Sequence, residues 1–232
     1  MDRKLFPHAR RGILAALCLT ALIGAPATAQ DGTPDRSQYT EMSSEELAQH
    51  LMFKAGGFKT DMATQEGTTV GKRLQQDALQ KTCSGRGQMD SANVSKVIKI
   101  ARNSMQYPEG GIELGDWKKG QALSENAFGF RVGHSIDDHS AKETGGLCIN
   151  CHKMEEKKAI RSGTLGPSLV NYGNNRGTGE DTKKYTYEVL YNPHVFFPCT
   201  KMPRFGVNGV LTQEKISHIM AYLLDPESPV NE

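Results

Sequence analysis

The chain has 232 residues, with 28 Lys and Arg against 26 Asp and Glu, so its formal net charge is +2 at neutral pH. The first 29 residues hold four of the basic residues and one acid, so 24 basic residues face 25 acidic ones without them. Because this balance is nearly neutral, the composition excludes a nucleic-acid-binding protein that relies on a basic surface. Subtracting those 29 residues from 232 leaves 203, enough for one full domain and a smaller segment.

Residues Met1 to Ala29 have the pattern of a secretory signal peptide. Four basic side chains flank the start of an apolar run from Gly12 to Ile23, and Ala27-Thr28-Ala29 is a small-residue cleavage site. The apolar run is shorter than the roughly twenty residues that a spanning helix needs, and no later stretch approaches that length. We therefore expect residues 1–29 to be removed, with Cys18 among them, and the mature protein to be periplasmic without a membrane span.

Residues 30–111 are predicted to form a helical N-terminal extension. Apolar side chains recur there at helical spacing in three sets, which we interpret as packing faces, with a partner-binding surface as the alternative. A turn-rich stretch at 107–111 ends the extension. The sets are Leu47, Leu51 and Met52 after the capping box Ser43-x-x-Glu46; Leu74, Ala78 and Leu79 up to Gly85; and Val94, Val97, Ile98, Ala101 and Met105 after Asp90 or Ser91.

Residues 112–232 form the second predicted domain, and their pattern is also helical. Asp116 begins one helix, residues 185–191 form a short one, and Thr212 begins a last helix that ends before Asp225-Pro226. No run shows the sustained alternation that is typical of a strand in a sheet. The sequence therefore predicts an all-α fold.

The stretch Cys148-Ile149-Asn150-Cys151-His152 follows the first of these helices. Cys-x-x-Cys-His is the attachment site of a c-type haem, because two thiols on one turn can add to the two vinyl groups of one porphyrin. The adjacent His152 would then be the proximal iron ligand. A thioredoxin-like redox pair and half of a zinc site are the alternatives, but there is no βαβ pattern and no second Cys pair. We therefore predict one covalently bound haem c on Cys148 and Cys151.

Two cysteines, Cys83 and Cys199, remain after the signal and the motif are set aside. In an oxidising compartment an even remainder usually means a bridge, so we expect a disulfide between them. Two free thiols, or a bridge to another subunit, are the alternatives.

A helix, the attachment turn, a loop and a C-terminal helix in this order resemble a class I cytochrome c. The resemblance implies that the second axial ligand lies in the loop before the last helix, where Met202 precedes Pro203. It also implies that Pro167 offers its carbonyl to the second ring nitrogen of His152. The expected architecture is thus a class I cytochrome c-like haem domain, residues 112–232, with an N-terminal helical extension.

Other residues compete with Met202 for the second axial position. Met154 lies too close to His152 along the chain to reach the opposite face of the ring, and His194 is the next alternative. His218 falls off the apolar stripe of the last helix, which indicates a solvent-exposed side chain. His134 and His139 lie in a loop rich in Gly and Asp and are interpreted as surface residues.

Five segments of the second domain together resemble the SoxX family, the small monohaem subunits of the SoxAX cytochromes of bacterial thiosulfate oxidation. The resemblance implies a heterodimer with a SoxA-like cytochrome subunit. The larger subunit would join thiosulfate to a carrier-protein cysteine, as an L-cysteine S-thiosulfotransferase, while this chain relays electrons to a downstream cytochrome c. No catalytic residue is expected in this chain, and a freely diffusing class I cytochrome c is the alternative. The segments are 115–120, 163–172, 191–194, 202–206 and 221–226.

Overall fold

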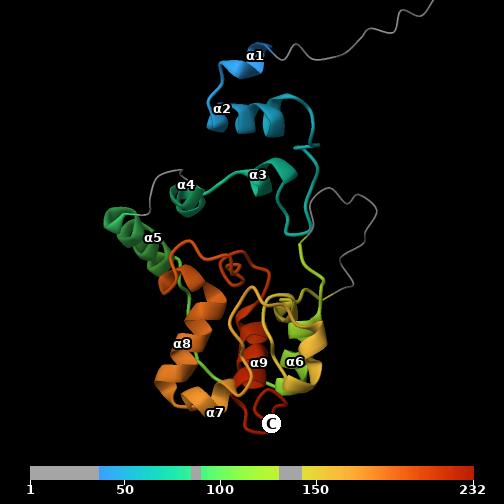
Figure 1. Ribbon diagram of the computed structural model, residues 1–232, viewed down its shortest axis with the longest axis vertical. Coiled ribbons are helices and arrows are strands. Elements are labelled where there is room, and N and C mark those ends of the chain that lie inside the picture. The colour runs from blue at the N-terminus through green and yellow to red at the C-terminus, as the bar shows by residue number, and fades with distance from the viewer. Residues whose placement is uncertain (1–36, 85–89, 131–142) are drawn as a thin grey trace, which may run out of the picture. The chain divides into compact units, whose positions relative to one another are not determined.

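The computed structural model describes residues 37–84, 90–130 and 143–232, and in these ranges the regular secondary structure is helical apart from an isolated bridge between Ala63 and Thr69. The predicted all-α fold is confirmed for this part of the chain (Figure 1). The signal segment, His134 and His139 lie outside the described residues. The α-helices are α1 (Ser37–Thr40), α2 (Ser44–Gln49), α3 (Val70–Leu74), α4 (Ala78–Ser84), α5 (Ser91–Asn103), α6 (Trp117–Glu125), α7 (Tyr172–Arg176), α8 (Glu180–Tyr191) and α9 (Gln213–Leu224). The π-helix η1 (His50–Lys54) and the 3-10 turns η2 (Cys148–Asn150), η3 (Glu156–Arg161) and η4 (Pro193–Val195) complete the described elements.

Helix α9 lies between α6 and α8 and supplies much of the main core (Figure 1). The apolar stripe of this helix is buried. The side chain of Asp116 accepts the backbone N–H of Lys118 at 2.7 Å at the start of α6. Thr212 accepts the N–H of Lys215 at 3.2 Å at the start of α9. Both predicted helix starts are therefore confirmed, because a side-chain cap satisfies a donor that the helix leaves free.

Gly120 allows α6 to lie against α9 with no side chain between the two backbones. A Cβ atom there would lie 2.6 Å from the carbonyl carbon of His218 and 2.8 Å from the Cβ of Tyr222. The start of α6 also covers His218, whose Nδ1 accepts the Asp116 N–H at 2.8 Å. The predicted solvent exposure of His218 is wrong, since its side chain is only 13% exposed. The spacing of apolar residues along a helix does not reveal that a distant backbone segment packs against the polar side of that helix.

A smaller core joins α4, α5 and η4 through Leu79, Val97, Ala101 and Val195. Helix α5 begins where the sequence predicts, because Asp90 accepts the N–H of Asn93 at 2.7 Å. The preceding predicted helix is instead divided into α3 and α4, with extended backbone at the residue that follows Leu74. Helix α8 begins at Glu180, five residues before the predicted start.

The first predicted packing face is wrong. Neither α2 nor η1 contains a buried residue, and Leu51 is 46% exposed. The helical spacing of apolar residues predicts the helix but not a partner for its face.

The chain divides into two compact units, Met1–Ser43 and Ser44–Glu232, so the segments on either side of residue 111 share the second unit. The hydroxyl of Tyr107 donates to Glu188 at 2.5 Å, and that of Tyr187 donates to the Gln106 carbonyl at 2.7 Å. The turn-rich stretch is thus tied to α8. In the part of the chain that the structure describes, no helix is long and apolar enough to cross a membrane.

Candidate haem site

Both motif cysteines lie on one tight turn. Cys148 begins η2, and its carbonyl accepts the N–H groups of Cys151 at 3.1 Å and of His152 at 2.9 Å. Leu147, just before the turn, has a left-handed backbone with φ of 43°, which directs the chain into it. Neither cysteine is in a disulfide, and both residues are half-buried. Burial raises the pKa of the Cys148 thiol to about 11, in contrast to the lowered pKa of a redox-active thiol.

A close-fitting loop orients the ring of His152. Its Nδ1 lies 2.8 Å from the carbonyl oxygen of Pro167, and because a carbonyl only accepts, Nδ1 carries the proton. Nε2 then has its lone pair available to a metal, and no described residue makes a hydrogen bond to it. Gly166 donates its N–H to the Cys151 carbonyl at 2.7 Å. A Cβ on Gly166 would lie 2.6 Å from Nδ1 of the histidine, so only glycine fits beside this ring.

Met202 lies in the loop between η4 and α9, half-buried against the main core. The attachment turn borders this loop. A Cβ on Gly146 would lie 3.2 Å from the Sγ of Cys148 and 3.7 Å from Phe205, three residues after Met202. Thr144 donates its hydroxyl to the Val210 carbonyl at 2.6 Å, which ties the chain before the turn to the same loop. The structure thus brings the loop that carries Met202 beside the segment just before the motif.

The alternatives to Met202 have other partners. Met154 is only 1% exposed and belongs to the main core. His194 is 7% exposed, and its Nδ1 accepts the N–H of Cys199 at 2.9 Å. Burial lowers the pKa of His194 below its ordinary value of 6.5, and the positive charge of Arg204 lowers it further.

A disulfide joins Cys83 and Cys199, with 5.4 Å between the Cα atoms and a sequence separation of 116. It attaches α4 of the extension to the loop that carries Met202. Arg204 of the same loop donates to Asp77, at the start of α4, with 2.7 Å between Nη1 and Oδ2. Sequence reasoning missed Asp77 and Arg204. The only local signal is the pair Asp77-x-x-Gln80, which has the spacing of a helix cap.

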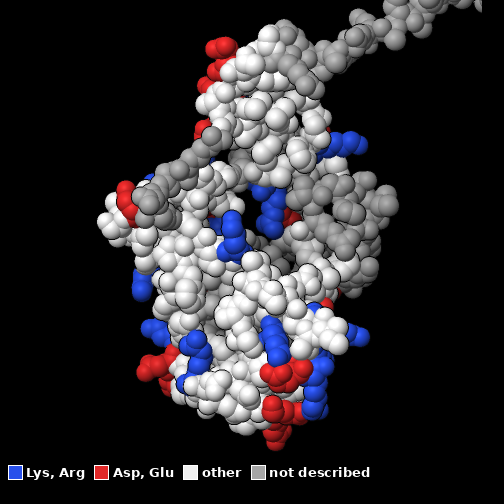
Figure 2. Space-filling model, viewed as in Figure 1, with Lys and Arg blue, Asp and Glu red and all other residues white. Residues whose placement is uncertain are grey.

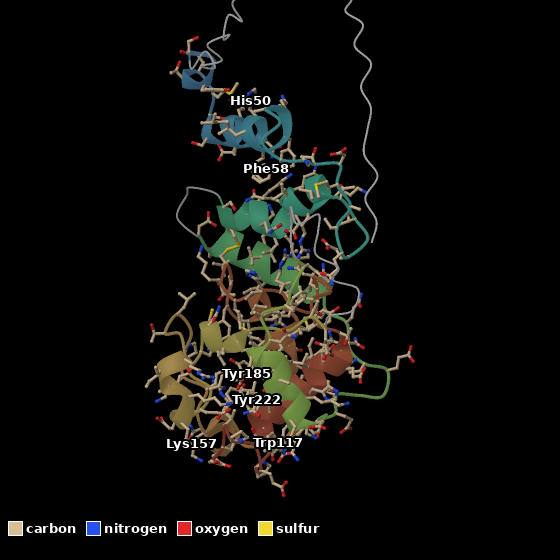
Figure 3. All side chains as sticks on the ribbon, turned by 90° about the vertical axis from the view of Figure 1, so that its right-hand side faces the viewer. His50, Phe58, Trp117, Lys157, Tyr185 and Tyr222 are labelled. Carbon is tan, nitrogen blue, oxygen red and sulfur yellow. A yellow bond between two sulfur atoms is a disulfide. The ribbon has the colours of Figure 1, made fainter. Side chains whose placement is uncertain are left out.

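A buried carboxylate, also missed from the sequence, follows the motif. Glu155 is 5% exposed, and its Oε1 accepts from Tyr222 at 2.5 Å, Gln121 at 2.7 Å and Lys158 at 3.0 Å (Figure 3 labels Tyr222). Burial alone would raise the pKa of Glu155, but these hydrogen bonds lower it below the ordinary value of 4.5. The network fixes the chain after His152 to both α6 and α9.

The residues present fit a covalently attached haem. Two unpaired thiols share one turn, and the adjacent imidazole is held by Nδ1 with Nε2 available. Half-buried apolar side chains at the edge of the main core offer a surface that a porphyrin would cover. Among the described residues, no group of three or more His, Cys, Asp and Glu could hold a metal ion. The apolar side chains are Cys148, Ile149, Leu169, Met202, Val207 and Val210.

The described fold and site define an all-helical protein with a Cys-x-x-Cys-His turn held beside a methionine-bearing loop. No family model matches the chain. The chain is 41% identical over 159 residues to an uncharacterized lipoprotein of Aquifex aeolicus (strain VF5). The aligned region covers 68% of this chain and 73% of that protein. The chain therefore belongs to the same family as this lipoprotein.

Proposed function

We propose that this chain is an exported class I c-type cytochrome that relays electrons as the SoxX-like subunit of a SoxAX complex. The observation that carries the proposal is the Cys148–His152 turn, with its unpaired thiols and an imidazole oriented by Pro167. Cys148 and Cys151 would hold the haem covalently, His152 would bind the iron through Nε2, and Met202 would be the second axial ligand. A haem held in this way supplies one-electron oxidation and reduction.

The chain's own residues have defined parts in this proposal. The Pro167 carbonyl keeps the imidazole in one tautomer and raises its basicity through the hydrogen bond to Nδ1. Gly166 lets the loop lie directly against the ring. A thioether ligand from Met202 favours ferrous iron, which raises the reduction potential relative to two histidines and suits an electron acceptor.

One observation favours export, and the charge of one segment favours an acidic partner. The relative's name, lipoprotein, is consistent with export of this chain to the periplasm. From Lys153 to Arg204 there are nine Lys and Arg against five Asp and Glu. Figure 2 shows several basic side chains in the middle of one face, while most acidic side chains in this view lie toward its ends. A basic surface of this kind speeds association with an acidic partner such as a SoxA-like subunit, at low ionic strength.

Haem attachment is tested by the absorbance spectrum of the purified protein and by haem that stays on the chain in a denaturing gel. The double variant Cys148→Ser, Cys151→Ser should lose both signals. The double variant Cys83→Ser, Cys199→Ser removes the same number of cysteines and should keep both signals. A wild-type chain without bound haem would refute the cytochrome assignment and favour the alternative, a redox pair of Cys148 and Cys151.

The axial ligand and the complex need separate tests. Met202→Ala should abolish the near-infrared band of an iron–methionine bond, while Met154→Leu, which keeps the volume of a core residue, should retain it. For the complex, native purification should yield a second cytochrome subunit, and deletion of this chain should abolish thiosulfate-dependent cytochrome reduction. A haem-bearing monomer that is dispensable for thiosulfate oxidation would instead favour a freely diffusing class I cytochrome c.

A further inference from the structure

The loop that carries Met202 is held on both sides of this residue by the two ends of one helix. Cys83, near the end of α4, is disulfide-bonded to Cys199, three residues before Met202. Asp77, at the start of α4, accepts from Arg204, two residues after Met202, at 2.7 Å. We propose that α4 is a splint for this loop and that Asp77 is a positioning residue for Met202. The inference rests on the proposed function, in which Met202 binds iron.

The splint is itself anchored. Leu79 of α4 is 2% exposed and packs in the smaller core with Val97, Ala101 and Val195. The reciprocal cap at the start of α4 fixes Asp77, because its Oδ1 accepts the N–H of Gln80 at 2.8 Å and its own N–H donates to Oε1 of Gln80 at 3.0 Å. One carboxylate oxygen therefore caps the helix, and the other is directed at Arg204.

The charges make Asp77 difficult to replace. The side chain of Arg204 is 10% exposed and that of Asp77 is 48% exposed. A guanidinium that is largely removed from water needs an anionic partner, since an unpaired buried charge is costly. Without Asp77, the loop would have to move to return this guanidinium to water, and Met202 lies two residues away.

The other end of the loop is also constrained. Cys199 has a left-handed backbone with φ of 59°, which is uncommon for a residue other than glycine. Its N–H is bonded to His194 in η4, and its sulfur is bonded to α4. The segment from Cys199 to Arg204 is therefore fixed at both of its ends. This arrangement gives the N-terminal extension a function in positioning the proposed iron ligand Met202.

The test compares Asp77→Asn and Asp77→Ala with a matched control, Asp90→Ala. Asp90 caps α5 in the same way, through Asn93, but has no described contact with the loop. Asparagine at position 77 can still cap α4 but lacks the charge, so it separates the cap from the ion pair. Asp77→Asn also serves if Asp77→Ala fails to fold.

Two measurements are made on the full chain. The first is titration of the haem-bearing protein with imidazole, which displaces a loosely held axial methionine. Both Asp77 variants should bind imidazole about three- to tenfold more tightly than the wild type, and Asp90→Ala should bind it as the wild type does. The second is hydrogen–deuterium exchange of residues 199–208, which should be faster only in the Asp77 variants.

Equal imidazole affinity and equal exchange in the Asp77 variants and the wild type would overturn the splint. The splint would also be refuted if Asp90→Ala changed the imidazole affinity and the exchange rate as much as the Asp77 variants do. Failure of the proposed function is distinguishable from these outcomes. A wild-type chain without haem, or a Met202→Ala variant with an unchanged near-infrared band, would refute the ligand assignment, whereas deuterium exchange still reports whether Asp77 holds the loop.

Discussion

Replacing Gly120 by alanine tests the packing of α6 on α9. In an exposed helix interior this substitution would stabilise the protein by about 1 kcal/mol, because alanine has the higher helix propensity. Here the added Cβ would lie 2.6 Å from the His218 carbonyl carbon and 2.8 Å from the Cβ of Tyr222, whereas real Cβ atoms keep at least 3.0 Å away. Two of the neighbouring atoms belong to a backbone carbonyl in a helix, so they cannot turn aside as a side chain would.

The two helices must therefore separate along the main core. Overpacking of this kind costs about 1–3 kcal/mol. We take the upper end of this range for the overpacking cost, because the obstacle is backbone. Subtracting the gain in helix propensity leaves a net loss of about 2 kcal/mol in the free energy of unfolding. For a domain of this size, the melting temperature should fall by about 4–8 °C.

The assay is urea or thermal unfolding of the purified chain followed by circular dichroism. Gly110→Ala is the control, because no described atom lies within 4 Å of a Cβ at Gly110 and its φ is not positive. It should change the free energy of unfolding by less than about 1 kcal/mol, toward greater stability. If Gly120→Ala were as stable as Gly110→Ala, the close approach of the two helices would be wrong.

Three further predictions concern the site. Gly166→Ala places a Cβ 2.6 Å from Nδ1 of His152, so it should break the bond to Pro167 and lower the haem content per chain, measured by pyridine haemochrome absorbance; an unchanged content would contradict this. Cys83→Ser should lower the free energy of unfolding by about 2–4 kcal/mol, and two alkylated thiols in the unreduced wild-type haem protein would show that the bridge is absent. Glu155→Gln should be less stable than the wild type at neutral pH. The pKa of Glu155 is depressed in the folded state, so its stabilisation is present above 4.5 and is lost as the pH falls through the folded value; a stability difference that persists in acid would refute this.

Local signals in the sequence were sufficient to predict where most helices begin. Asp90, Asp116 and Thr212 each cap a helix where expected, because a cap depends on residues within one turn. The pairing of Cys83 with Cys199, which cysteine counting favoured, is present in the structure. The local pattern also identified the motif turn, and Pro167 accepts from His152 as the resemblance to class I cytochromes implied.

Interactions between distant segments were not predictable. The pair of Asp77 and Arg204 joins residues 127 apart, and neither residue has a local pattern that names the other. The burial of His218 depends on the segment at Asp116, 102 residues earlier. Leu51 belongs to a set of apolar residues at helical spacing, but no described residue covers it. The spacing therefore predicted the helix correctly and its packing face incorrectly. The identity of the second iron ligand also depends on such long-range placement and stays a prediction.

The bond between Cys83 and Cys199 has a consequence for how the exported chain matures. It encloses the segment that carries Cys148 and Cys151, so the motif thiols lie inside a covalent ring of the polypeptide. Of the single disulfides that these four cysteines could form, only Cys83–Cys199 leaves both motif thiols free to react with a cofactor. The bridge forms by oxidation, whereas the motif thiols must stay reduced until the haem is attached, so under the proposed function the oxidant and the attachment machinery compete for one chain. Oxidation of Cys148 or Cys151 before attachment would yield a chain that cannot be loaded until that disulfide is reduced.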